Sequence, residues 1–340
     1  MRWIEALVLG LVQGVTEFLP ISSDGHLSIS EQALAWWSGV RHTGSENLFF
    51  FVMLHLGTLA AILVHYRREG LEGAKGLLGK STNSPEFDRN SVIKAGLLAC
   101  VATLPAIPVG LFLKKPLEAA FESPIAAPLG FLVTALAIGS TFYLKGGKRG
   151  LAGTTWWHAL LIGSAQAIAI LPGVSRSGMT IMTALTLGFT RTWAVGFSLL
   201  MAIPAILGAA VLELKDVEKS MIAPDRIGPI LLGVVAAGLV GYLAIVWLVR
   251  VVQSGRMWYF SVYLVILSAC LLGLHFLNKG KTNGPRTARA ERSLLVEPPA
   301  QGPSTFPEPR SRGLDRPQRA RQATNARLDR ASPADGLLRI

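Results

Sequence analysis

Six long apolar stretches with few charges constrain this chain more than any other feature of its sequence. A helix needs about 20 mostly apolar residues to cross a hydrocarbon layer about 30 Å thick, and each stretch is close to that length. Apolar residues make up 51% of the 340 residues and charged residues only 16%, unlike a soluble domain. The predicted spans are Leu48–Tyr66, Ile93–Leu113, Pro124–Leu144, Trp193–Leu212, Ile227–Val249 and Met257–Leu277. The sequence therefore predicts an all-α integral membrane protein with six transmembrane helices.

The chain changes character after residue 278. Residues 279–340 carry 13 Lys and Arg against 6 Asp and Glu, with repeated prolines. Such a segment cannot bury enough apolar area to offset its ordering entropy, so we expect a disordered basic tail. Phe306 is its single aromatic residue on which a base could stack, so contact with anionic lipid headgroups or plain solvation is favoured over nucleic-acid binding. The membrane-embedded domain is predicted to comprise residues 1–278.

Two further apolar regions are interrupted by a proline and a polar loop. In the first region, the apolar segment Ile4–Leu19 is followed by Pro20, the polar loop Ile21–His26 and a second apolar segment, Leu27–Trp37. In the second region, Trp156–Leu171 is followed by Pro172, the loop Gly173–Gly178 and Met179–Phe189. Each half is too short to cross a bilayer comfortably. We interpret both regions as re-entrant helical hairpins, which are tolerated at membrane depth where protein or a water-filled cavity satisfies the backbone.

The two halves of the chain share one order of elements, a hairpin followed by three spans. Gln13 lies seven residues before Pro20 and Gln166 six residues before Pro172, which indicates a diverged repeat over about residues 1–144 and 155–278. Three spans are an odd number, so the second hairpin enters from the side opposite to the first. Such an inverted-topology repeat places polar sites near the midplane, where the broken helices meet.

Basic loops suggest which side of the membrane is cytoplasmic. Lysine and arginine are frequent in the loops Arg67–Asn90 and Lys145–Gly153, and the positive-inside rule places such loops in the cytoplasm.

The loop Pro172–Gly178 has the composition of an anion site. It combines small residues, the hydroxyls of Ser175 and Ser177, and the start of a helix, whose free N–H groups attract anions. Arg176 can add a bidentate contact to phosphate oxygens. The alternative is a serine cap beside a snorkelling arginine, but an arginine in the middle of an apolar hairpin is costly and usually functional. We expect an anion site.

The loop Glu17–His26 supplies reactive groups. Ser23 and His26 are three residues apart at the start of a short helix, and a hydroxyl beside an imidazole is the minimal pair of nucleophile and base. Gln13 and Glu17 are four residues apart and share a helix face, so Glu17 could orient His26, bind a divalent cation through oxygen, or do both.

Each of these residues has a plainer interpretation when it is taken alone. Ser22, Ser23 and Asp24 are ordinary helix-capping residues, and His26 could be a buried histidine with satisfied hydrogen bonds. Together with Arg176, however, they form a constellation that suits phosphoryl transfer, in which positioning and charge neutralisation dominate.

Two alternatives to an enzyme follow from the architecture. Inverted repeats with broken helices are typical of transporters, so a transporter or lipid flippase is the main rival. The Ser23 and His26 pair, which transport does not need, argues for an enzyme. A scaffold acting through the basic tail is a third hypothesis. The remaining histidines lack metal-ligand spacing, and we interpret them as packing or interfacial residues: His55, His65, His158 and His275.

The sequence around both loops resembles the undecaprenyl-diphosphatase family of bacterial membrane enzymes, also called bacitracin-resistance proteins. The resemblance rests on Gln13–His26 (QGVTEFLPISSDGH) and Leu171–Gly178 (LPGVSRSG), and Leu54–Thr58 (LHLGT) resembles the family's first span. It covers roughly residues 1–278. Two long motifs in the right order make it specific.

The resemblance implies an activity and a location. The chain would hydrolyse undecaprenyl diphosphate to undecaprenyl phosphate and inorganic phosphate, recycle the cell-wall lipid carrier and confer bacitracin resistance. It would be a multi-pass protein of the inner (plasma) membrane, with an active site reached from the periplasm. A divalent cation, Mg²⁺ or Ca²⁺, is implied as cofactor, with Glu17 as its candidate ligand. The partners would be the lipid substrate and membrane lipids and no nucleic acid, while a homodimer stays open.

The resemblance implies that the family's acidic motif corresponds to Gln13 and Glu17, its serines to Ser22 and Ser23, its essential histidine to His26 and its arginine to Arg176. The residue roles that follow are our predictions. Glu17, Ser23, His26 and Arg176 are the predicted catalytic residues, with Ser23 as a nucleophile activated by His26. Attack by His26 itself, or by a water that His26 activates, is left open. Asp24 stands where many family members carry threonine, and this extra carboxylate would strengthen metal binding or weaken anion affinity. The predicted substrate-binding residues are Gln13, Ser22, Gly25, Gly173, Ser175, Ser177, Gly178 and Thr180.

Overall fold

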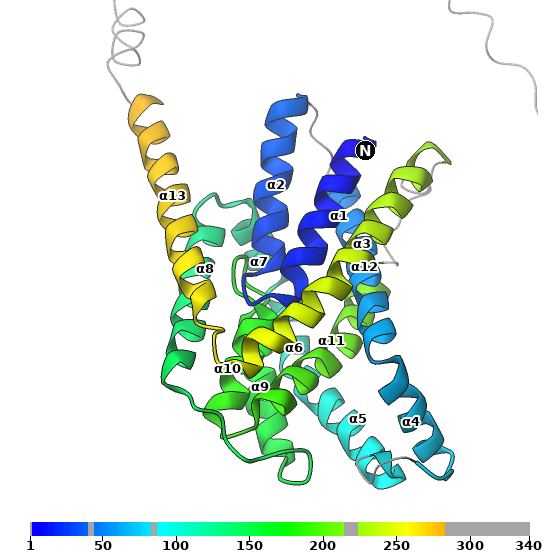
Figure 1. Cartoon of the computed structure of the whole chain (residues 1–340). Coiled ribbons are helices and arrows are strands. Elements are labelled where there is room, and N and C mark those ends of the chain that lie inside the picture. Colours follow the sequence, from blue (N-terminus) through cyan, green and yellow to red (C-terminus); the bar gives the residue numbers. More distant parts are fainter. Residues whose placement is uncertain (1, 40–43, 83–86, 214–223, 283–340) are drawn as a thin grey trace, which may run out of the picture. The chain divides into compact units, whose positions relative to one another are not determined.

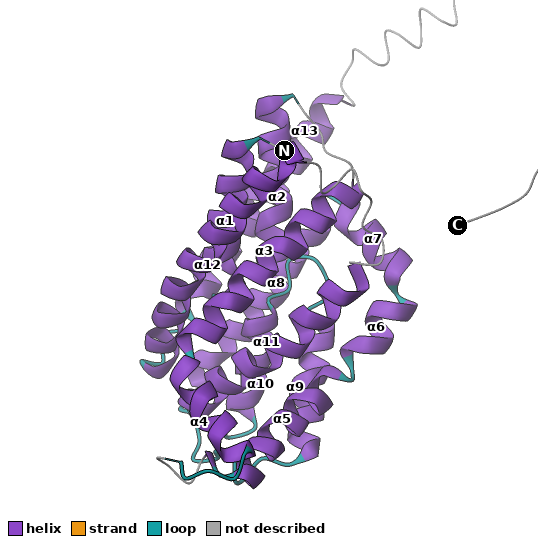
Figure 2. Ribbon diagram, turned by 90° about the vertical axis from the view of Figure 1, so that its right-hand side faces the viewer, coloured by secondary structure: helices purple, strands orange, loops and turns teal. Residues whose placement is uncertain are grey.

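The computed structural model describes residues 2–39, 44–82, 87–213 and 224–282. Helices make up the regular structure of these residues, apart from a single β-bridge between Arg149 and Phe189 (Figure 2). The predicted tail lies outside the described residues from residue 283 onward. Its first residues continue the last helix, α13 (Tyr259–Thr282).

All six predicted spans are helical. They correspond to α3 (Gly44–His65), α5 (Arg89–Thr103) with α6 (Ala106–Phe112), α8 (Ala126–Gly139) with the 3₁₀ turn η2 (Ser140–Tyr143), α11 (Arg191–Glu213), α12 (Pro224–Gln253) and α13. Among the described residues, five helical stretches are long and apolar enough to cross a membrane, and a sixth is obtained when α3 is joined to α4 (Arg67–Leu77), which bends away by 72°. The chain is therefore a multi-pass membrane protein.

The outer surface supports the same conclusion. Large apolar side chains point outward from several spans, including Phe112, Leu136 and Leu277, which are 82%, 77% and 68% exposed. In water such an apolar surface would promote aggregation, whereas in a membrane it contacts lipid tails that are equally apolar.

Both predicted hairpins are present. The first is formed by α1 (Trp3–Phe18) and α2 (Ser23–Ser38), and the second by α9 (Trp156–Ile168) and α10 (Arg176–Thr186). At 1.5 Å per residue these helices measure about 16–24 Å, less than the roughly 30 Å of the hydrocarbon layer. Figure 1 shows α1 and α2 extending from one end of the bundle and α9 and α10 from the other, with their loops meeting in the middle. The hairpins thus have opposite orientations, as an inverted repeat requires.

Helix packing follows the same symmetry. The helix α1 packs mainly against α12, and its counterpart α9 packs mainly against α5, so each hairpin is held by a span from the other half. The equivalent spans α3 and α11 pack together, as do α8 and α13. Small residues allow these close approaches: a Cβ atom at Gly10 would overlap the backbone of Gly233, and one at Gly163 would overlap that of Ala102.

Two short helices were not expected from the sequence. The segment predicted as the loop Arg67–Asn90 begins with α4, and α7 (Lys114–Glu122) follows the break after α6. A short polar helix at the end of a span needs no apolar stretch, so hydropathy alone gives little indication of it. The break between α5 and α6 falls at Pro105, which has no backbone N–H to donate to the helix.

Candidate active site

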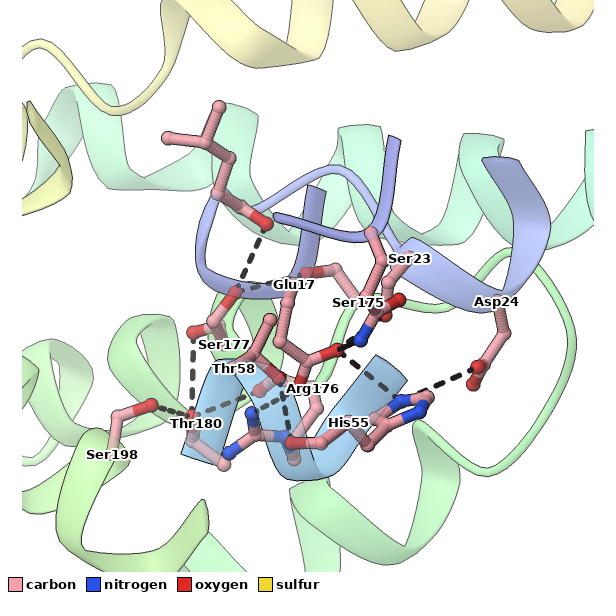
Figure 3. Close-up of polar contacts among 12 residues, drawn as sticks. Glu17, Ser23, Asp24, His55, Thr58, Ser175, Arg176, Ser177, Thr180 and Ser198 are labelled. Carbon is pink, nitrogen blue, oxygen red and sulfur yellow. Dashed lines mark hydrogen bonds and ion pairs between the residues drawn. The ribbon is translucent and has the colours of Figure 1, made fainter. Parts of the chain in front are cut away.

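The site lies where the two hairpin loops meet, with Glu17 and Ser23 of the first hairpin beside Ser175 and Arg176 of the second (Figure 3). Each loop ends in a serine helix cap. The Ser22 hydroxyl accepts a hydrogen bond from the Gly25 N–H at 3.4 Å and caps α2. The Ser175 hydroxyl accepts from the Gly178 N–H at 3.1 Å and caps α10. Ser22 has φ of +69° and is the one non-glycine residue with a positive φ among the described residues. Such strain persists where the surroundings impose it, and it clusters at functional sites.

The helix α8 holds the second loop in place. The Thr134 hydroxyl donates to the Gly173 carbonyl at 3.0 Å and accepts from the Ser175 N–H at 2.9 Å. Gly173 has φ of +83°, and a Cβ atom there would overlap the Ala127 carbonyl. The backbone of residues 173–175 therefore lies directly against α8, and this fixes where α10 begins.

The two loops also contact each other directly. The Ser177 hydroxyl donates to the Leu19 carbonyl at 3.2 Å and so connects the second loop to the first. A Cβ atom at Gly25 would lie 2.6 Å from the Phe131 ring and 3.1 Å from the Gly173 Cα. Gly25 is thus required where the loops approach each other.

Glu17 joins the two hairpins through its carboxylate, which is almost fully buried. Its Oε1 accepts from the Arg176 Nη2 at 2.7 Å, and the two residues form an ion pair across the halves of the chain. Its Oε2 accepts from the Ser23 hydroxyl at 2.7 Å and from the Gln13 side-chain amide at 3.0 Å. The predicted residues Gln13, Glu17, Ser23 and Arg176 are therefore brought together.

His26 has different partners from those that the sequence suggested. Its Nδ1 donates to the Ser22 carbonyl at 2.7 Å, so its Nε2 accepts from the Tyr263 hydroxyl, also at 2.7 Å. The imidazole stacks on the Tyr263 ring, with centroids 5.8 Å apart. The expected pairing of His26 with Ser23 or Glu17 is not formed, because the bond to the carbonyl four residues earlier turns the ring toward α13.

His55 is a site residue that sequence reasoning missed. Its Nδ1 donates to the Phe51 carbonyl at 2.8 Å, and its Nε2 lies 3.4 Å from Glu17 Oε2 and 3.9 Å from Asp24 Oδ1. Figure 3 shows the ring directed at these two carboxylates. An ionisable side chain inside an apolar span is itself a sign of function, and that signal was available in the sequence.

The remaining hydroxyls lie behind the accessible groups. Ser175, Ser177 and Thr180 are at most 2% exposed, and the Thr180 hydroxyl is 2.7 Å from that of Ser198 on α11. The side chains of Asp24, His55 and Arg176 are 44%, 23% and 18% exposed. A ligand would meet these three side chains first, while the buried hydroxyls hold the loops.

The arrangement does not fit Glu17 as a metal ligand. Both of its oxygens already accept from donors, and Arg176 and His55 place positive charge beside them. The described residues also contain no group of three or more His, Cys, Asp or Glu that could hold a metal ion. Glu17 instead orients Ser23 and Arg176.

Comparison with known proteins gives one consistent match. The family described as "Bacitracin resistance protein BacA" matches residues 6–270, which include nearly all of both hairpins and of the spans.

Individual relatives agree with the family match. A protein from Alcanivorax borkumensis named undecaprenyl-diphosphatase is 39% identical over 283 residues, covering 80% of this chain and 98% of the relative. Proteins with the same name from Carboxydothermus hydrogenoformans and Desulfatibacillum aliphaticivorans are 37% and 34% identical, each covering 82% of this chain and 100% of the relative.

Proposed function

This chain belongs to the BacA family of bacitracin resistance proteins, and from that premise we propose that it is an undecaprenyl-diphosphate phosphatase of the inner membrane. The relatives' names supply the substrate. One observation in the site carries the chemistry: the Ser23 hydroxyl donates to Glu17 at 2.7 Å while Arg176 holds the other oxygen of the same carboxylate. A nucleophile, a proton acceptor and a phosphate-binding cation thus lie within one hydrogen-bonded group.

The reaction would proceed through Ser23. Its Oγ attacks the terminal phosphorus, and its proton passes to Glu17 Oε2, which already accepts the hydroxyl hydrogen bond. The bond from phosphorus to the bridging oxygen breaks, and the lipid monophosphate leaves as an anion. Water then cleaves the bond between phosphorus and Ser23, which restores the hydroxyl and releases inorganic phosphate. A water held by the same groups could attack directly, with Glu17 again taking the proton.

Arg176 would bind the diphosphate. A guanidinium makes bidentate contacts to phosphate oxygens, and a substrate bound in this way competes with Glu17 for the same N–H groups. Substrate binding would thereby release Glu17 to accept the Ser23 proton. His26 is less suited to attack, because both of its ring nitrogens are engaged.

The divalent cation implied by the resemblance, Mg²⁺ or Ca²⁺, is also a proposal. Because Glu17 is fully engaged, such an ion would take its ligands chiefly from the phosphate oxygens and water, as Mg²⁺ commonly does with phosphate substrates. It would neutralise phosphate charge. None of the steps above depends on it.

The test is phosphate release from a polyprenyl diphosphate by the purified full-length protein, with Mg²⁺ and with a chelator. We expect release by the wild type and a loss of roughly 100-fold or more in Arg176→Ala, as when a charge-stabilising donor is removed. Arg68→Ala, which removes an exposed arginine outside the site, is the matched control and should leave the rate unchanged.

The outcomes separate the hypotheses. Full activity in Arg176→Ala would contradict the assignment of the active site. Full activity in Ser23→Ala would contradict only the assignment of Ser23 as the nucleophile. Movement of the lipid across liposomes without phosphate release would favour the transporter.

A further inference from the structure

Four side chains from four helices bring two negative and two positive groups into one site. The carboxylates are Glu17 on α1 and Asp24 on α2, and the cationic groups are Arg176 on α10 and the imidazole of His55 on α3. The proposed phosphatase must bring a diphosphate, which is itself strongly anionic, into this cluster. One guanidinium cannot offset both carboxylates and the substrate, so the second cation decides whether the site attracts or repels an anion.

The hydrogen bonds of His55 indicate its charge. A backbone carbonyl can only accept, so the contact with Phe51 at 2.8 Å places a proton on Nδ1. The Nε2 faces oxygens of Glu17 and Asp24 at 3.4 and 3.9 Å. A bare lone pair would be repelled by two carboxylates, whereas an N–H is attracted to both. The geometry therefore favours an imidazolium.

We propose that His55 is a further positioning residue of the site: its imidazolium is the counter-charge of Glu17 and Asp24, and it leaves Arg176 available to the diphosphate. This inference rests on the proposed function. His55 contacts Oε2 of Glu17, whereas Arg176 holds Oε1 of the same carboxylate, and His55 joins α3 to the first hairpin. Asp24 is the more exposed carboxylate, at 44%, and lies where a substrate would approach. If His55 lost its charge, Asp24 would face the incoming anion uncompensated.

The test is a double-mutant cycle on the full-length protein, read as kcat and KM for phosphate release. His55→Gln keeps a side-chain donor but removes the positive charge, and we expect KM to rise about tenfold while kcat changes less than about threefold. Asp24→Asn removes the facing negative charge, which repels the diphosphate, and should lower KM by about twofold, so strict additivity predicts a KM about fivefold above the wild type in the double variant. The double variant should recover to within about threefold of the wild-type KM, because the charge balance is restored.

His65→Gln is the matched control, since His65 ends the same helix and packs against Tyr66 and Tyr242 outside the site. It should leave KM unchanged, and its combination with Asp24→Asn should be additive. Thermal unfolding of each variant identifies losses due to misfolding. If His55→Gln unfolds early, His55→Lys, which retains the charge, should keep a near-wild-type KM.

Two results would overturn the inference. One is an unchanged KM in His55→Gln, and the other is strict additivity of His55→Gln with Asp24→Asn. Both results count against the inference only when the wild-type protein releases phosphate in the same assay. An inactive wild type would instead count against the proposed function.

Discussion

The Glu17 carboxylate is surrounded by donors: Arg176 on one oxygen, Ser23 and Gln13 on the other, and His55 nearby. Removing one partner from a buried ion pair typically costs 3–5 kcal/mol, because the remaining charge is left uncompensated. Each side chain of this group is therefore held in place by the others, and a substitution of any one of them shifts the rest. His26, which lies nine residues after Glu17 and on the next helix, is outside this group and faces α13 instead.

We expect the Tyr263 hydroxyl to hold the His26 ring in place, as Arg176 holds the Glu17 carboxylate. Tyr263→Phe keeps the ring stacked on the imidazole but removes the hydroxyl that donates to Nε2. A hydrogen bond of this kind contributes about 0.5–1.5 kcal/mol. If His26 activates the attacking water, the alternative that the sequence left open, activity should fall by about 2- to 12-fold with little change in thermal stability.

Tyr259→Phe is the comparison, because Tyr259 lies on the same helix and is 55% exposed. It should behave as wild type. Equal phosphate release by Tyr263→Phe and Tyr259→Phe would show that the Tyr263 hydroxyl does not support His26.

The members of the site could be identified from sequence, but not their pairing. Glu17, Ser23, His26 and Arg176 are conspicuous because they interrupt apolar sequence. The spacing of Ser23 and His26 suggested a pair, yet Ser23 bonds to Glu17, because the loop turns at Ser22 with a positive φ that residue spacing does not encode. His55 was missed because it stands alone in its span, and only the fold places it beside Glu17.

At the scale of elements, the position of the loop Pro172–Gly178 depends on the backbone contact between residues 173–175 and α8. Thr134 bonds to both ends of this segment, and Gly173 permits both the left-handed turn and the close approach to Ala127. The start of α10, and with it Arg176, is fixed by this contact rather than by the loop alone.

Gly173→Ala should disrupt that contact. The positive φ costs about 1–2 kcal/mol for a residue with a Cβ atom, and the Cβ would also overlap the Ala127 carbonyl. We expect a clear loss of thermal stability and at least a tenfold loss of phosphatase activity, because Arg176 shifts with the loop.

Gly188→Ala separates the cost of the positive φ from the loss of the contact with α8. Gly188 has a similar φ of +82°, but a Cβ there would meet no atom within 4 Å. This variant should lose a similar 1–2 kcal/mol to the backbone and keep its activity. If both variants retained full activity, the contact with α8 would not position the site.

At the scale of the whole molecule, the described residues form a bundle in which each half holds the hairpin of the other. The sequence indicated this plan, because about 20 apolar residues per span and a proline at each loop leave few alternatives. It did not indicate α4 and α7, whose polar composition is equally compatible with a loop, nor the bend of 72° after α3.

The basic tail should contribute little to catalysis. Every residue assigned to the site lies at or before Thr180, the partners Ser198 and Tyr263 also precede the tail, and the family match ends at residue 270. We expect a variant ending after residue 284 to retain phosphate release within about twofold of the full chain in the same lipid or detergent. Loss of activity in this variant, with unchanged thermal stability, would favour a scaffold that acts through its tail.

The ion pair between Glu17 and Arg176 has a consequence for biogenesis. The two residues are 159 positions apart, so the ribosome delivers the first hairpin to the membrane long before its partner exists. Until then the Glu17 carboxylate lies in an apolar hairpin without its guanidinium, a state that is costly inside a bilayer. The first hairpin is therefore expected to settle late, after the second half of the chain has been inserted, and an N-terminal fragment on its own should be a substrate for membrane quality-control proteases.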